Sequence, residues 1–186
     1  LAAGLALSGK IVFTYSIANF PTLRPLEQIR NDVCYHNANV KIVIIGGGLA
    51  YGPLGVSHQA TEDIAIMRAI PTMTVIVPAD AVETRKAAEA AAWYDGPVYI
   101  RLTRAELPVL FREEDEFRIG KGWSVAEGSD VTIVGIGLML HEALKARSLL
   151  AASGISARVI NTSTVKPIDS GLIAACAKQT GCVVTA

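Results

Sequence analysis

The stretch SHQATEDIAIMRAIPTMTVIVPADAVETRKAAEAAAWYDGPVYIRLTR, residues 57–104, alternates between helix-like and strand-like patterns. Apolar side chains recur at helical spacing over 59–69, and a short apolar strand is expected at 74–77. A longer helix is expected from 81 to 93, ended by Asp-Gly-Pro, and the next strand follows at 98–102. Because buried strands alternate with helices, this pattern predicts a parallel sheet covered on both faces.

The same alternation extends toward the first residue. Residues 1–9 have the composition of a helix that closes at a glycine, and the β-branched and aromatic run 11–15 predicts a buried strand. A helix is expected over 27–35, and the run VKIVII at 40–45 predicts another buried strand. Residues 1–106 are therefore predicted to form an α/β domain, a three-layer sandwich around a mostly parallel sheet.

A charged, irregular run separates this domain from a second α/β pattern. Residues 107–128 are expected to be an interdomain linker, with a solvated surface loop as the alternative. Residues 129–186 begin a second unit, which has too few elements to be a complete domain. Its expected strands are 131–137, 157–161 and 182–186, and its expected helices are 141–152 and a second one after Lys166-Pro167. Both ends of the chain look interrupted, so a fragment, or a subunit completed by another chain, is expected.

The composition excludes several classes of partner. The chain has 186 residues, of which 51% are apolar, and its 17 basic and 17 acidic residues balance. This is typical of a soluble globular protein, and nothing in it would attract a nucleic acid or a membrane surface. No apolar run is long enough to cross a bilayer, and the opening residues lack the basic leader of a signal peptide. The three cysteines (Cys34, Cys176 and Cys182) have apolar neighbours and no metal-like spacing, which predicts buried, reduced thiols and a cytoplasmic location.

A glycine-rich loop follows the strand at 40–45. Gly46, Gly48 and Gly52 resemble the spacing with which dinucleotide-binding loops approach a pyrophosphate. Pro53 and Gly55 interrupt any helix there, and no strand ends in an acidic residue at the usual distance downstream. A flexible loop near a ligand is the favoured interpretation, and a nicotinamide-binding protein is a distant alternative.

Three side chains beside this loop are candidates for chemistry. His58 precedes an expected helix, so its imidazole is expected near the positive end of that helix, although a lone histidine is often structural. Arg101 and Arg104 lie at the end of a predicted strand, where open α/β sheets bind ligands, and two arginines could grip a phosphate or carboxylate. The alternative is a surface salt bridge to Glu106 or Glu113.

The order of these features resembles a known family. The His58-Gln59 pair, a helix ending in RAIP at 68–71, a strand ending in PAD at 78–80 and a DGP turn at 95–97 before an arginine-bearing strand are together similar to the pyrimidine-binding domain of transketolases. Cousins of this domain occur in deoxyxylulose-phosphate synthases and in the beta subunits of 2-oxo-acid dehydrogenases. Residues 130–186, with VIN and KPID, look like the start of the C-terminal domain of that family.

The resemblance implies a cofactor and roles for four residues. Transketolases bind thiamine diphosphate between two chains, and a separate N-terminal domain or subunit holds the diphosphate and its Mg²⁺ while this domain receives the aminopyrimidine ring. By resemblance, His58 would assist proton transfer or hydrogen-bond an oxyanion, and Arg104 would bind the phosphate of the sugar. Tyr15 and Phe20 would stack on the aminopyrimidine, with Phe13 as a third candidate.

The chain also departs from the family pattern. Leu54 and Gly46 stand where transketolases carry a substrate-contacting aspartate and a phosphate-contacting histidine. The activating glutamate of the family belongs to a segment that should precede residue 1, and none of the glutamates present stands in its motif, Glu27, Glu62 and Glu83 included.

The expected function is that of a transketolase subunit, which transfers a two-carbon ketol unit between sugar phosphates of the pentose phosphate pathway. The expected assembly is a homodimer or a heterotetramer with the N-terminal subunit. The alternatives are a related thiamine-diphosphate enzyme, either a deoxyxylulose-phosphate synthase or a 2-oxo-acid dehydrogenase beta subunit, or a truncated, non-catalytic assembly module.

Overall fold

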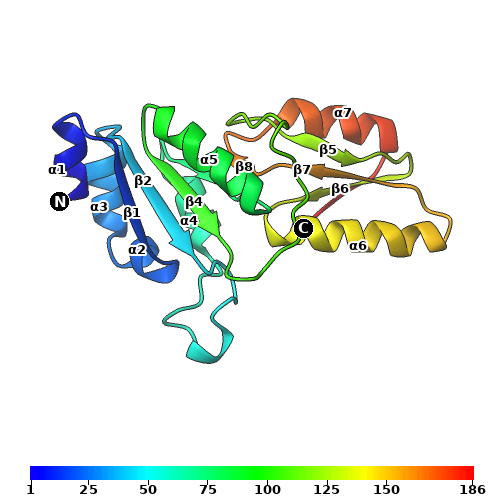
Figure 1. Ribbon diagram of the computed structural model, residues 1–186, viewed down its shortest axis with the longest axis horizontal. Helices are drawn as coiled ribbons and strands as arrows, with labels where there is room; N and C mark the ends of the chain where they lie inside the picture. The colour runs from blue at the N-terminus through cyan, green and yellow to red at the C-terminus, as the bar shows by residue number, and fades with distance from the viewer.

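The computed structural model describes residues 1–186 and contains two α/β units, each with its own sheet (Figure 1). The first sheet has the strand order β1-β2-β4-β3-β8, in which the first four strands are parallel and β8 runs antiparallel to β3. These strands are β1 (Val12–Ile17), β2 (Val40–Ile45), β3 (Thr74–Ile76), β4 (Val98–Leu102) and β8 (Thr164–Lys166).

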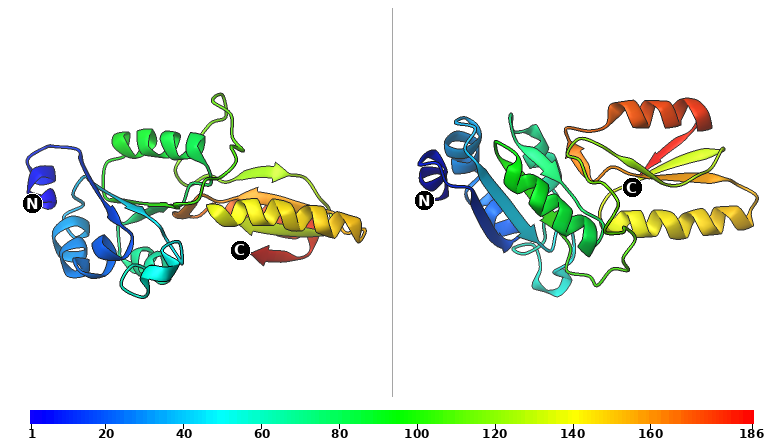
Figure 2. Two further views of the ribbon diagram at one scale, coloured as in Figure 1. Left: turned by 60° about the horizontal axis from the view of Figure 1, so that its bottom comes forward. Right: turned by 45° about the horizontal axis from the view of Figure 1, so that its top comes forward.

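Helices cover both faces of the first sheet, as Figure 2 shows. They are α1 (Ala2–Leu7), α2 (Asn19–Leu23), α3 (Leu26–Gln28), the π-helix η1 (Ile29–Cys34), α4 (Asp63–Ala69) and α5 (Ala81–Trp93), whereas the 3₁₀ turn η2 (Gly52–Leu54) lies in the loop that follows β2. Along β2, Ile42 and Ile44 pack with η1 and α4, whereas Val43 packs with α5 on the opposite face. This alternation of side chains between two apolar layers confirms the three-layer sandwich.

The second unit has the strand order β5-β7-β6-β9. Its strands are β5 (Trp123–Ala126), β6 (Val131–Gly135), β7 (Ala157–Asn161) and β9 (Val183–Thr185), and all are parallel except β5. Helix α6 (Leu138–Ala152) packs on one face and α7 (Ser170–Thr180) on the other (Figure 1). The prediction of a second α/β unit is therefore confirmed.

Several predicted boundaries differ from the structure. The expected linker 107–128 contains the strand β5, which pairs with β7. The strand is formed by the short alternating run WSVA near the end of this segment. Strand β8 leaves the second unit and adds to β3 of the first sheet. The helix expected over 59–69 begins only at Asp63, and the helix expected over 27–35 is divided between α3 and η1.

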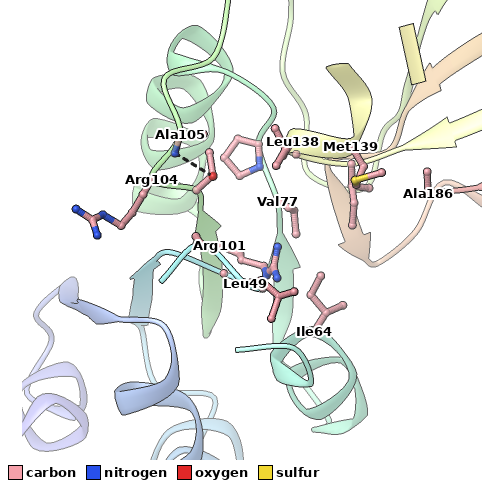
Figure 3. Close-up of a pocket in the computed structure, with 16 residues that line it drawn as sticks. Leu49, Ile64, Val77, Arg101, Arg104, Ala105, Leu138, Met139 and Ala186 are labelled. Carbon is pink, nitrogen blue, oxygen red and sulfur yellow. Dashed lines mark hydrogen bonds between the residues drawn. The ribbon is translucent and has the colours of Figure 1, made fainter. Parts of the chain in front are cut away.

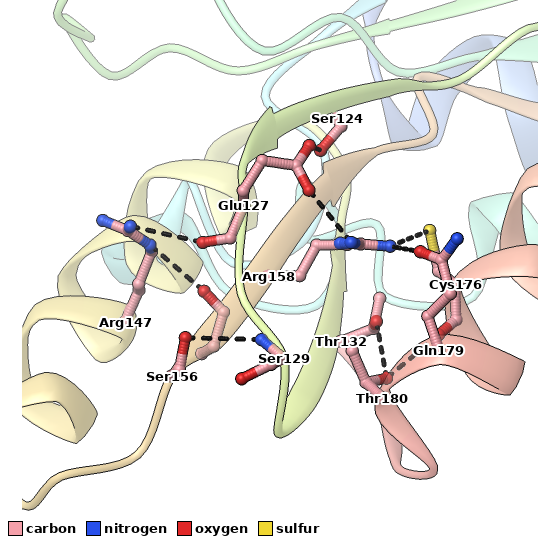
Figure 4. Close-up of polar contacts among 11 residues, drawn as sticks. Ser124, Glu127, Ser129, Thr132, Arg147, Ser156, Arg158, Cys176, Gln179 and Thr180 are labelled. Carbon is pink, nitrogen blue, oxygen red and sulfur yellow. Dashed lines mark hydrogen bonds and ion pairs between the residues drawn. The ribbon is translucent and has the colours of Figure 1, made fainter.

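A half-buried arginine joins the second sheet to helix α7. Arg158 on β7 forms an ion pair with Glu127 (Nη2 to Oε2, 2.9 Å) and donates to Gln179 and to the sulfur of Cys176 on α7 (Figure 4). Cys34 and Cys176 are buried free thiols, as the sequence predicts, but Cys182 is exposed because it follows the end of α7. No helix of the structure combines the length and apolar character needed to span a membrane.

The two units meet at a hydrogen-bonded seam formed by Ala79, Glu83, His141 and Asn161. One carboxylate oxygen of Glu83 accepts from the Ala79 amide at 2.6 Å, and the other accepts from Asn161 Nδ2 at 2.7 Å. His141 Nε2 lies 2.8 Å from the Ala79 carbonyl oxygen. Burial raises the pKa of the Glu83 carboxyl, and the hydrogen bonds from Ala79 and Asn161 only partly oppose this rise.

Candidate functional site

The carboxyl ends of β1, β2 and β4 lie next to one another, because these three strands are parallel neighbours. The segment after β1 carries Phe20, the loop after β2 carries Tyr51 and His58, and the segment after β4 carries Arg104. Ligands of open α/β sheets bind at this edge. The topology therefore gathers side chains from three separate stretches of sequence at one candidate site.

Three rings form a continuous row at this edge. The His58 ring contacts the edge of Phe20 at 5.1 Å between centroids, and its distance to the Tyr51 ring is 5.9 Å. A guanidinium lies over each outer ring: Arg24 is 4.3 Å from the Phe20 centroid and Arg104 is 4.7 Å from the Tyr51 centroid. We call Phe20, His58 and Tyr51 the aromatic row. It places the imidazole between two rings, and each of these rings has a guanidinium over it at a distance that allows cation–π attraction.

The loop that carries His58 is held by side-chain hydrogen bonds. Asn19 at the start of α2 donates through Nδ2 to the carbonyl oxygens of Val56 (3.2 Å) and Ser57 (3.1 Å). Ser57 Oγ lies 2.9 Å from His58 Nδ1. When the Ser57 hydroxyl donates to Nδ1, the imidazole carries its proton on Nε2, which can then donate to a ligand.

The prediction that His58 sits at a helix N-terminus is wrong. Residues 56–58 form a turn, Ala60 forms an isolated β-bridge with Gly48, and α4 begins only at Asp63. His58 is half-buried among rings and hydrogen-bonded turns, so these contacts, rather than a helix dipole, orient it.

The glycines after β2 make room for two side chains. Gly46 has a φ of +81°, and a Cβ on it would overlap the Tyr51 ring; a Cβ on Gly47 would overlap the Arg101 guanidinium. The loop continues into η2 rather than opening a helix, unlike a dinucleotide-binding loop. The glycine pattern thus reflects close packing of Tyr51 and Arg101.

The two arginines of the β4 edge have different roles. Arg101 donates through Nε to the buried Asp63 carboxylate at 2.8 Å, and Tyr99 donates to the same carboxylate at 3.0 Å, which makes Arg101 part of the scaffold. Arg104 is exposed and forms no ion pair. The expected alternative, a salt bridge to Glu106 or Glu113, is therefore wrong, and the Arg104 guanidinium remains open to an anion.

A cavity of about 750 Å³ separates this edge from the second unit. Gly47, Gly48 and Arg101 line it on one side, and Leu138 and Met139 at the start of α6 line it on the other. In Figure 3 the Arg101 side chain points toward Leu49 and into this space, and Arg104 also lines the cavity, with its guanidinium at the outer end. Arg104 therefore belongs both to the lining of the cavity and, through its position over Tyr51, to the surroundings of the aromatic row.

The structure brings together three of the four residues singled out in the sequence. His58, Phe20 and Arg104 belong to the row or flank it, whereas Tyr15 lies on β1 with 67% of its surface exposed, on the same face as Phe13. Sequence reasoning missed Tyr51. One signal could have found it, because Tyr51 is the only side chain from Gly46 to Val56 that can form a hydrogen bond.

Two family models cover most of the chain. The model described as "Transketolase, pyrimidine binding domain" matches residues 1–109, and the model described as "Transketolase, C-terminal domain" matches residues 120–186.

Comparison with individual proteins and solved structures gives the same family. The chain is 45% identical to a 6-deoxy-6-sulfo-D-fructose transketolase subunit of a Clostridium species, over 100% of this chain and 58% of that protein. It is 38% identical to 1-deoxy-D-xylulose-5-phosphate synthase 1 of Geobacter sulfurreducens, over 100% of this chain but 29% of that protein. A solved structure described as "Split gene transketolase, inactive beta4 tetramer" superposes with a TM-score of 0.92 at 48% identity, over 100% of this chain and 60% of that one. The chain spans about three fifths of the length of these transketolase subunits, and it belongs to the transketolase family.

Proposed function

We propose that this chain is the pyrimidine-binding and C-terminal part of a two-subunit transketolase, which transfers a two-carbon ketol unit between sugar phosphates. The observation that carries the proposal is the aromatic row, in which His58 lies between rings and two guanidinium groups at the ligand-binding edge of the sheet. Such an arrangement offers a proton carrier and an anion site within one small area.

The residues present fit the ring end of thiamine diphosphate but not its diphosphate end. Phe20 and the exposed Tyr15 offer aromatic surfaces for the aminopyrimidine. The structure contains no group of three or more His, Cys, Asp or Glu residues that could hold a metal ion. We therefore assign the diphosphate and Mg²⁺ to an N-terminal partner subunit. When bound, the cofactor would supply the carbanion stabilisation that ketol transfer needs.

His58 and Arg104 act on the substrate in this proposal. With the Ser57 hydroxyl donating to Nδ1, the Nε2 atom of His58 carries the proton and donates a hydrogen bond to the substrate oxygen on which negative charge develops. Arg104 has no anionic partner in the protein, so its planar donors are available to a phosphate. The guanidinium then sets where the sugar chain lies relative to the imidazole.

Two observations support a partner subunit. The strand β1 lies at the edge of its sheet and leaves Phe13 and Tyr15 exposed on one side, next to the exposed Ile11 that precedes the strand, which suits contact with another chain. The similar split-gene transketolase is described as an inactive beta4 tetramer. We propose that this chain works in a dimer of subunit pairs, a heterotetramer, with a simple homodimer as the alternative, and in the cytoplasm.

The test is reconstitution. The full-length polypeptide that carries this chain is mixed with its diphosphate-binding partner, thiamine diphosphate and Mg²⁺, and ketol transfer from xylulose 5-phosphate to an aldose phosphate is measured. We expect activity only when both subunits are present. No transfer and no cofactor binding by the mixture would contradict the proposal.

The second candidate is another thiamine-diphosphate enzyme, such as a deoxyxylulose-phosphate synthase or a 2-oxo-acid dehydrogenase beta subunit. Gly46 and the exposed Leu54 favour it, because neither provides a polar contact to a ketose phosphate. Supplying pyruvate instead of xylulose 5-phosphate as the donor separates the two candidates. Condensation or oxidation of pyruvate would identify the second.

A further inference from the structure

Tyr51 occupies a central position in the site that neither the family models nor the names of the relatives explain. From Gly46 to Val56 the loop reads GGGLAYGPLGV, and every side chain in it except Tyr51 is apolar or absent. The positions of Gly46 and Leu54 offer no polar group. Any hydrogen bond from a side chain of this loop to a ligand must therefore come from the Tyr51 hydroxyl.

Packing fixes the Tyr51 ring. The residue is 8% exposed, and its ring rests against the Gly46 backbone, where even a Cβ would overlap it. The other contacts of the ring are the Arg104 guanidinium at 4.7 Å and the His58 ring at 5.9 Å between centroids. One ring thus touches both the anion-binding group and the proton carrier of the proposed site.

The Tyr51 hydroxyl is free for a ligand. It forms no hydrogen bond within the protein, whereas the other buried tyrosine, Tyr99, bonds to Thr22 and Asp63. Although the Tyr51 side chain is buried, its oxygen is not among the enclosed polar atoms that lack a partner, so it keeps access to solvent. A buried ring with an accessible, unbonded hydroxyl is a rigid donor.

We propose that Tyr51 determines substrate specificity in the site: its ring holds Arg104 and His58 at a fixed spacing, and its hydroxyl hydrogen-bonds to a hydroxyl or phosphate oxygen of a sugar phosphate. This inference rests on the proposed function. It assigns to the loop a polar contact that Gly46 and Leu54 do not make. Tyr51 acts as a positioning residue through its ring and as a substrate-binding residue through its oxygen.

Two substitutions in the reconstituted two-subunit enzyme separate these roles. Tyr51→Phe keeps the ring and removes the hydroxyl, so we expect KM for the phosphorylated ketose to rise about three- to tenfold with kcat nearly unchanged, as for one lost neutral hydrogen bond. Tyr51→Leu also removes the support for Arg104 and His58, so we expect kcat to fall as well and kcat/KM to drop about a hundredfold. The ratio of activity on phosphorylated to unphosphorylated ketose falls in Tyr51→Leu, because this variant loses the ring that supports Arg104.

Tyr35→Phe and Tyr35→Leu are the matched controls, since Tyr35 is 84% exposed at the end of η1 and its ring pairs with His36, far in sequence from the site residues. Subunit assembly and the unfolding midpoint are measured for each variant, and both are expected to match wild type for Tyr51→Phe. If the wild-type complex transfers ketol units but Tyr51→Phe and Tyr51→Leu show wild-type KM, kcat and substrate ratio, the role of Tyr51 is contradicted while the proposed function stands. An inactive wild-type complex contradicts the proposed function, and this inference with it.

Discussion

His58 in the aromatic row and His141 in the seam differ in how many of the polar groups around them have partners within the protein. In the seam, His141 is 6% exposed and bonds to the Ala79 carbonyl, and both oxygens of Glu83 have partners from the protein. In the aromatic row, only one nitrogen of His58 has a partner within the protein, and Arg104 has no ion pair. In the seam, both oxygens of Glu83 and the Nε2 atom of His141 have partners within the protein, although the buried Oδ1 of Asn161 has none. The row instead leaves donors available to a ligand.

Whether a polar group already has a partner within the protein distinguishes structural from functional groups better than the type of residue does. Glu83 and His141 are the kinds of residue expected of an acid and base, and burial even raises the pKa of Glu83. However, Glu83 on α5 is hydrogen-bonded to Asn161 on β7, and His141 on α6 is hydrogen-bonded to Ala79, which follows β3. The polar atoms of Glu83 and His141 therefore hold the two units together. Available donors at the ligand-binding edge, rather than a shifted pKa, mark the candidate site.

The largest expected effect concerns the two histidines. In the reconstituted enzyme, His58→Ala should lower kcat by about 10²- to 10⁴-fold, the usual range for a lost proton-transfer group, and change the free energy of unfolding by less than about 1 kcal/mol. His141→Ala should show the reverse, with a loss of stability of about 1–3 kcal/mol, because it leaves the buried Ala79 carbonyl without a partner. Steady-state kinetics and urea denaturation measure both. Equal losses of kcat in the two variants would contradict the distinction between the regions.

Glu83 comes next. Glu83→Ala removes the acceptor of two buried donors and should lower the free energy of unfolding by about 3 kcal/mol in urea denaturation. Glu83→Gln keeps one acceptor oxygen and should lose less. Glu89→Ala, at an exposed position of the same helix, is the control and should stay within about 0.5 kcal/mol of wild type. A Glu83→Ala variant as stable as the Glu89→Ala control would show that the seam contributes nothing.

The raised pKa of Glu83 gives this comparison a pH dependence. The folded state favours the protonated carboxyl, so the stability contributed by Glu83 is fully present below its ordinary pKa of about 4.3 and is lost as pH rises through the raised value. Glu83→Gln cannot titrate. The stability difference between wild type and Glu83→Gln should therefore narrow as the pH rises above that window, which urea denaturation at several pH values can follow. A difference that stays constant or widens would contradict the assigned direction of the shift.

Arg104 should show a smaller effect that depends on the substrate. Arg104→Ala should reduce kcat/KM for a phosphorylated ketose about ten- to a hundredfold, as expected for a lost charge-assisted bond, and leave an unphosphorylated ketose almost unaffected. Arg104→Lys keeps the charge but not the planar donors and should recover part of the loss. Arg112→Ala is the control, because Arg112 is exposed and its only ion pair is with Glu114 at 3.8 Å. An equal loss on both ketoses would exclude a phosphate contact.

The sequence predicts the regular elements better than the site. Helix α5 and strand β4 have the expected bounds, because a long apolar periodicity and the Asp-Gly-Pro turn are local signals. The addition of β8 to the first sheet is a contact between distant residues and leaves no local pattern. Likewise, His58 and Arg104 are predictable as residues, but Tyr51 could be placed between them only once the loop after β2 was seen to fold back over Gly46.

The smallest expected effect tests whether the loop must be held for the row to work. Asn19 donates to the carbonyls of Val56 and Ser57 and makes no hydrogen bond to any of the rings. Asn19→Ala frees these carbonyls, but they lie in an exposed loop where water can replace the amide, so stability should change by less than about 1 kcal/mol. The looser position of His58 should still lower kcat a few-fold, because catalysis is sensitive to small misplacements.

Asn19→Asp is the sharper variant, since it keeps the shape but replaces a donor with an acceptor that faces two carbonyls, and it should lower kcat more than alanine does. If both variants have the kcat of wild type, the rings alone position His58, and the hydrogen bonds from α2 have no part in the site.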